Sequence, residues 1–150
     1  MLLGYIMGEL EKPRGQFWNV SAHALTAQQE ASLESLGCDG HIEHVRMGSV
    51  NPNWDTEAVD AFVRSQLVNI VIATERVGDD DGADGTSHHV AMVAGEPIAT
   101  VCAVRFLQSL GVRCVAATTE RVSQETTTPG GVVLKVGEFK FVRWRDFPKL

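Results

Sequence analysis

Two hydroxyls and an arginine follow one apolar run closely enough to bind a phosphate together. In the stretch RCVAATTERVSQE, residues 113–125, Thr118, Thr119 and Arg121 come directly after residues of a kind found in buried strands. Neutral donors and a fixed cation in a short arc suit an oxyanion better than a metal ion. We therefore predict that a strand ends near Thr118 and opens into a turn that binds a polyanion. The alternative is an ordinary turn in which Glu120 and Arg121 pair in solvent.

A serine and a histidine follow the first predicted strand, GQFWNV at residues 15–20. A neutral imidazole suits general acid or base chemistry near neutral pH, so His23 is a candidate for moving a proton. Ser21 could donate a hydrogen bond to a phosphate from the same turn. The alternatives are a surface histidine and a serine that only satisfies the local backbone.

A glycine and a glutamate separate the predicted strand at residues 89–95 from the helix that begins at Pro97. Gly95 would let a ligand approach the backbone closely, and the start of a helix attracts anions. Glu96 stands at that position, where its carboxylate either caps the helix or contacts a ribose hydroxyl. The dinucleotide fingerprint GxGxxG is absent, which argues against a nicotinamide cofactor.

The last predicted strand contains two arginines spaced by two residues. Side chains alternate along a strand, so Arg143 and Arg145 should share one side while Trp144 points to the other. The pair could hold a phosphodiester. It could equally be the solvated charge that protects the edge of a sheet.

The hydrophobic pattern predicts strands that alternate with helices. Thr26 and Gln29 form a capping box that starts a helix ending before Gly37. The spacing from Asp55 predicts one long helix to residue 77, although its second half, residues 67–74, could also be a strand. The expected strands lie at residues 15–20, 41–47, 89–95 and 112–118, and the expected helices at 26–36, 55–77 and 97–110.

After a turn at residues 125–131, two short antiparallel strands are expected to meet around Gly137. The order of elements predicts an α/β fold, a Rossmann-like and mainly parallel sheet with flanking helices and an antiparallel C-terminal strand pair. Residues 15–150 should form one domain, preceded by an extension at residues 1–14. Ligands of such sheets bind beyond the carboxyl ends of the strands.

Composition narrows the possible partners. The net charge of −6 argues against duplex DNA or long RNA, because such binding needs many phosphate contacts. No apolar run could span a membrane, and we expect a cytoplasmic protein. Neither the five histidines nor the acidic loop at residues 78–85 has metal-ligand spacing, and the three cysteines lack CxxC pairing. No metal or cofactor is predicted.

Three segments together resemble a known family. NVSAHALTAQQEASLESLG, AGEPIATVCAVRFLQSLGVRCVAATTERVSQE and GEFKFVRWRDF are similar, in order and spacing, to the small CRISPR-associated proteins of type III systems that belong with the ring nucleases. The resemblance covers nearly the whole chain after Arg14. Ile98 stands where the family has glycine and Phe141 where a histidine is usual, and the acidic loop is an insertion.

The resemblance implies a homodimer that binds a cyclic oligoadenylate, the tetramer being the favoured ring, and cleaves it without a metal by attack of a ribose 2′-hydroxyl. Arg121, Thr118 and Thr119 would then hold the phosphoryl oxygens and His23 would move a proton. The remaining candidate ligand-binding residues are Ser21, Gly95, Glu96, Arg143 and Arg145. Two alternatives stay open: a sensor or sponge that binds the ring without cutting it, and an unrelated α/β protein.

Overall fold

The computed structural model describes residues 15–76 and 88–150. The N-terminal extension at residues 1–14 and the acidic loop at 78–85 lie outside the described residues. The strands are β1 (Gly15–Val20), β2 (Cys38–His44), β3 (Val90–Val93), β4 (Arg113–Thr127) and β5 (Val133–Asp146). The helices are α2 (Ala27–Ala31), the 3-10 helix η1 (Leu33–Leu36), α3 (Thr56–Gln66), α4 (Val68–Arg76) and α5 (Pro97–Ser109).

The five strands form one mixed sheet in the order β2-β1-β3-β4-β5, so the predicted α/β class is confirmed. The first four strands are parallel, and β5 runs antiparallel to β4. The chain leaves β1 toward β2 and then crosses to β3 on the other side of β1. The strand order therefore switches between β1 and β3, because the chain continues from β1 to β2 on one side and from β3 to β4 on the other.

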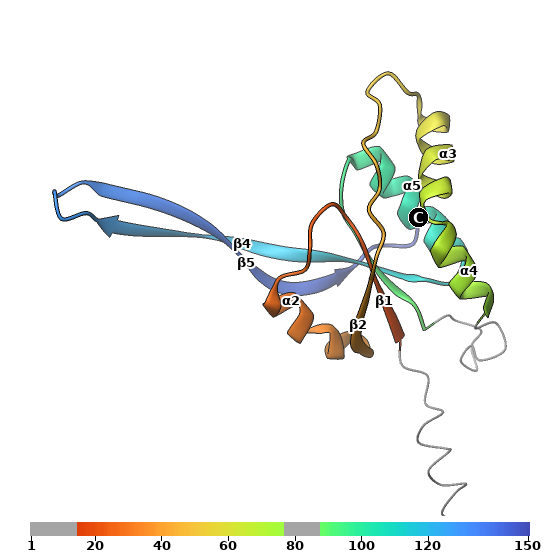
Figure 1. Ribbon diagram of the computed structural model, residues 1–150, viewed down its shortest axis with the longest axis horizontal. Coiled ribbons are helices and arrows are strands. Elements are labelled where there is room, and N and C mark those ends of the chain that lie inside the picture. The colour runs from red at the N-terminus through yellow and green to blue at the C-terminus, as the bar shows by residue number, and fades with distance from the viewer. Residues whose placement is uncertain (1–14, 77–87) are drawn as a thin grey trace, which may run out of the picture.

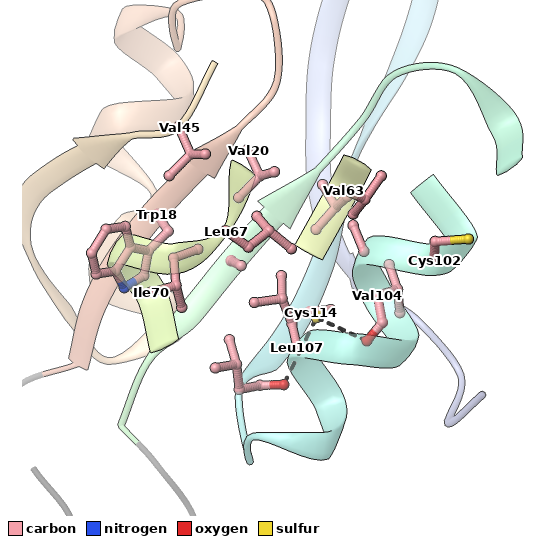
Figure 2. Packing of buried hydrophobic residues seen from close by; sticks show 14 of the residues in the cluster. Trp18, Val20, Val45, Val63, Leu67, Ile70, Cys102, Val104, Leu107 and Cys114 are labelled. Carbon is pink, nitrogen blue, oxygen red and sulfur yellow. Dashed lines mark hydrogen bonds between the residues drawn. The ribbon is translucent and has the colours of Figure 1, made fainter. Parts of the chain in front are cut away.

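Two hydrophobic clusters cover the two faces of this sheet. The larger one packs α3, α4 and α5 against residues such as Trp18, Val20 and Val93 (Figure 2). The smaller one joins Phe17 and Trp144 to residues of the α2 and η1 segment. A fully buried aliphatic or aromatic side chain contributes about 1.5–3 kcal/mol. Both faces of the central strands are thus shielded from solvent, which explains why all four residues of β3 are buried.

Local signals placed most helix ends correctly. Thr26 and Gln29 form both hydrogen bonds of the capping box that starts α2, and Gly37, with φ of 77°, ends η1. The predicted helix at residues 26–36 is nevertheless divided into α2 and η1. The predicted helix at 55–77 is likewise two helices, α3 and α4, separated at Leu67, where the backbone bonds to Arg64 three residues earlier. The alternative of a strand at 67–74 was wrong.

Two strand predictions need correction. The second strand spans Cys38–His44 rather than residues 41–47, because its backbone pairing with β1 starts at Cys38 and ends at His44. The predicted turn at Thr118–Arg121 is part of β4, which continues without interruption to Thr127.

The C-terminal pair is also longer than expected. The two short strands predicted around Gly137 are one strand, β5, which pairs with β4 from Val133 to Asp146. The two strands form a long hairpin that projects from the body of the molecule (Figure 1). A register shift between Thr118 and Thr119 marks the bulge where the hairpin leaves the rest of the sheet. Backbone pairing with β5, which is distant in sequence, keeps the segment after Thr118 extended and overrides the local turn signal.

Candidate functional site

A cleft of about 220 Å³ lies where the strand order switches. β1 and β3 pair up to Val20 and Val93, and both strands end there. The residues that follow, Ser21 and Gly95, therefore come to lie side by side. The lining consists of Ser21, Ala22, Met47, Gly48, Ser49, Val50, Ala94, Gly95, Glu96 and Ala99. Three residues that the sequence proposed as ligand contacts, Ser21, Gly95 and Glu96, are thus brought together.

A buried polar network fixes the turn after β1. The Asn19 side chain, 1% exposed, donates from Nδ2 to the carbonyl oxygen of His23 at 2.8 Å. The Ser21 hydroxyl donates to Asn19 Oδ1 at 2.7 Å. Satisfying a buried amide in this way holds the turn in one conformation. Ser21 therefore supports the backbone, as the simpler interpretation expected, and also lines the cleft.

Glu96 caps α5. Its two carboxylate oxygens accept from the backbone nitrogens of Ile98 at 3.2 Å and Ala99 at 2.8 Å. The capping interpretation is confirmed. A carboxylate here uses the donors that a phosphate would need and neutralises the positive end of the helix. The start of α5 is therefore a poor binding point for a phosphate.

A second cleft of about 250 Å³ adjoins the first and shares Val50 and Glu96 with it. Trp54, 39% exposed, lies in its wall and packs on Phe62 with 5.1 Å between ring centroids. A partly exposed indole ring held from behind can stack on a flat aromatic ligand. Sequence reasoning missed this residue, although a tryptophan in the polar loop NPNWD is an unusual exposed aromatic.

Cations gather at the base of the hairpin, on the side of the sheet that α5 covers. Arg145 pairs with Ala116 and Arg143 with Thr118, whereas Trp144 pairs with Ala117 and lies in the cluster on the opposite face. Opposed residues of an antiparallel pair share a face. The prediction that Arg143 and Arg145 lie on the same side of the sheet is therefore confirmed. It is the α5 side, the side that contains the two clefts.

The hydroxyl of Thr118 closes the bulge at this point. It donates to the carbonyl oxygen of Arg143 at 3.0 Å and accepts from the backbone nitrogen of Arg143 at 3.2 Å. Both bonds are local and hold β4 and β5 in register where the ladder shifts. The Thr118 hydroxyl thus stabilises the pairing of β4 with β5.

Two of the residues proposed for catalysis, Thr119 and Arg121, lie on the other side of the sheet. Thr119 pairs with Phe141, and Phe141 packs on the smaller hydrophobic cluster. Leu25, which follows His23 by two residues, belongs to the same cluster. Arg121 shares the face of Thr119 and lies over Gly137, since a β-carbon placed on that glycine would be 2.8 Å from Arg121 Nε. The His23 side chain is exposed, and neither of the two clefts is lined by His23, Thr119 or Arg121.

The cysteines are buried and free. Burial raises the pKa of the Cys38 thiol to about 11 and that of Cys114 to about 12, so both remain protonated near neutral pH. Among residues 15–76 and 88–150, no group of three or more His, Cys, Asp or Glu side chains could hold a metal ion. In the same part of the chain, no helix is long and apolar enough to cross a membrane.

A family model described as the uncharacterized protein MJ1673 family matches residues 15–145. The chain belongs to this family. The match begins at the first residue of β1 and runs through nearly all of β5, so it spans the segments that form the sheet, the two clefts and the hairpin in this chain. No curated protein and no solved structure matches the chain.

Proposed function

We propose that this member of the MJ1673 family binds a cyclic oligoadenylate, cyclic tetra-adenylate in particular, at the carboxyl edge of a Rossmann-like sheet, and cleaves it. The observation that carries the proposal is the cleft at the strand-order switch. Ser21, Gly95 and Glu96, chosen from the sequence as ligand contacts, meet there from two separate segments. Doubly wound sheets bind nucleotides at this place.

The arrangement of polar and aromatic groups fits an adenylate unit. Glu96, with Ser21 and Ser49 nearby, offers acceptors and hydroxyls to a ribose. The neighbouring cleft offers the Trp54 ring to an adenine base. Arg143 and Arg145 lie on the same side of the sheet and would attract the phosphates, despite the net charge of −6 of the whole chain.

The proposed reaction needs no group other than the ligand and protein side chains. A ribose 2′-oxygen forms a bond to the adjacent phosphorus while the bond from phosphorus to the 5′-oxygen breaks. The 2′-hydroxyl proton passes to a base, His23 in this proposal, and a proton joins the departing 5′-oxygen. A 2′,3′-cyclic phosphate and a 5′-hydroxyl result. Arg121 and Thr119 would stabilise the charge on the phosphoryl oxygens of a ring that extends over the sheet edge toward the α2 side.

A second candidate function is binding without cleavage. The position of Thr119 and Arg121 favours it, because these two residues lie on the α2 side while both clefts lie on the α5 side, and His23 lines neither cleft. A ligand held wholly within the clefts would not contact them. The protein would then act as a sensor or a sponge for the ring.

Tryptophan fluorescence can test binding, because only one of the three tryptophans is exposed. Trp18 and Trp144 are 6% and 7% exposed, against 39% for Trp54. Stacking of adenine on Trp54 should quench the fluorescence as cyclic tetra-adenylate is titrated. The Trp54→Phe variant should bind with similar affinity but without quenching. An absence of both quenching and thermal stabilisation by the ring would reject both candidate functions.

Chromatography of labelled cyclic tetra-adenylate after incubation in a chelator separates cleavage from sequestration. If Arg121 stabilises the transition state, Arg121→Ala should slow cleavage about a hundredfold. Lys135→Ala, which removes another exposed cation of the hairpin, should change the rate less than about twofold. Intact ring retained by the wild type would establish sequestration, and equal rates for wild type and Arg121→Ala would remove Arg121 from the mechanism.

A further inference from the structure

The hairpin exposes apolar side chains on both of its faces. Phe139 is 71% exposed and shares its face with Arg121, while Val136 and Leu134 point to the other face. Six of the twelve large exposed hydrophobic residues among those described belong to the turn and β5: Val132, Val133, Leu134, Val136, Phe139 and Val142. Such a concentration on one projecting element marks an interaction surface.

The hairpin also has open backbone edges. Within the part of the chain that the structure describes, β5 pairs only with β4, and β4 pairs with β3 only at residues 113–115. An unpaired strand edge is a template for another strand, and an isolated two-stranded ribbon is marginally stable in water. No proline interrupts residues 133–146 to prevent such pairing.

The side-chain pattern of β5 is complementary to itself. If two copies of β5 pair antiparallel about Phe139, Glu138 of each copy lies opposite Lys140 of the other, which gives two ion pairs. Phe139 then meets its own counterpart, and Phe141 of each copy lies opposite Gly137, over which the Arg121 side chain of that hairpin lies. Such a two-fold contact uses the same patch on both copies and closes on itself.

We propose that two copies of this chain associate through the free edge of β5, antiparallel and centred on Phe139. The two hairpins then form a four-stranded ribbon in which the Phe139 side chains of the two copies lie beside each other. The proposal does not depend on the ligand or on cleavage. It names the surface through which a two-fold dimer would form.

Charge reversal at Glu138 or at Lys140 gives a direct test. In Glu138→Lys, each Lys140 would meet a lysine, and in Lys140→Glu, each Glu138 would meet a glutamate. Either variant alone should dissociate at least about tenfold more readily than the wild type in analytical ultracentrifugation. An equimolar mixture should associate again, because every contact between the two variants then joins opposite charges. Circular dichroism checks that each variant is folded, since Lys140 also faces Glu120 within its own hairpin.

A second variant tests the centre of the contact. Phe139→Asp places two carboxylates against each other on the two-fold axis and should leave only monomer. Val101→Asp, at an exposed apolar position of α5 with 49% exposure, should leave the dimer unchanged. A wild type that is monomeric up to its solubility limit overturns the proposal. So does a dimer that neither Phe139→Asp nor the charge reversals weaken.

Discussion

The ion pair of Arg113 and Asp146 joins the first residue of β4 to the last residue of β5. Arg113 Nε donates to Asp146 Oδ1 at 2.6 Å, and Arg113 Nη2 donates to Asp146 Oδ2 at 3.2 Å. These bonds lower the pKa of Asp146 below its ordinary value of 3.8. Both side chains are about half exposed, so water screens the pair and its contribution to stability is small.

Removal of this pair has a defined pH dependence. A lowered native pKa means that the pair stabilises the fold above pH 3.8, and that this contribution is lost as the pH falls through the native pKa. Asp146→Asn should therefore lower the free energy of unfolding near neutral pH by less than about 1 kcal/mol. Urea denaturation should show the difference from wild type shrinking as the pH falls below 3.8. A difference that stays constant with pH would contradict this explanation.

Two glycines in different strands should respond to the same substitution with losses of stability of different size. A β-carbon on Gly15 of β1 would lie 2.5 Å from the carbonyl oxygen of His88 and 3.3 Å from that of Gly37. These are backbone atoms of packed neighbours and cannot easily retreat. Gly15→Ala should therefore lower the free energy of unfolding by about 1–3 kcal/mol in urea denaturation.

Gly137 of β5 is crowded only by a flexible side chain. The nearest atoms to an added β-carbon are Nε and Nη2 of Arg121, at 2.8 and 3.0 Å. The guanidinium can swing away, so Gly137→Ala should change the free energy of unfolding by less than about 0.5 kcal/mol. A loss of stability as large as that of Gly15→Ala would show that the position of Arg121 over the strand supports the hairpin.

The whole molecule divides into a body with two hydrophobic clusters and a hairpin that projects beyond it (Figure 1). Of the hairpin beyond the bulge, only Phe141 packs on a cluster. Glu120 and Lys140 lie directly opposite each other, so an Asn-Gly turn can replace residues 121–139 without a change of register.

The shortened protein should unfold cooperatively, with a free energy of unfolding within about 1 kcal/mol of that of a wild-type monomer. It should also be monomeric, because the pairing edge around Phe139 is gone. Urea denaturation and analytical ultracentrifugation measure the two properties. Loss of cooperative unfolding would show instead that the hairpin is part of the folding unit.

The amino-acid sequence alone determined where the helices start, through contacts between neighbouring residues, and the fold class, through the pattern of apolar residues. The Thr26 capping box, the Glu96 cap and Pro97 at the start of α5 act within one turn of helix, so they can be inferred from neighbouring residues. Alternating apolar patterns likewise predicted the α/β class and the helical character of residues 55–77. The split at Leu67 was not predictable in this way, because both halves have the same helical spacing.

Only the tertiary structure decided how far β4 extends and which face each site residue occupies. The segment after Thr118 remains a strand because β5, distant in sequence, supplies its partner. Unbroken alternation along β4 puts Thr119 and Arg121 on the α2 side, whereas Arg143 and Arg145 of β5 fall on the α5 side, because the extra residue of the bulge lies in β5 between Phe141 and Arg143. A shift of one residue in strand register would move every side chain of the strand to the opposite face of the sheet. Register is set by pairing between segments that are distant in sequence, so it cannot be inferred from neighbouring residues.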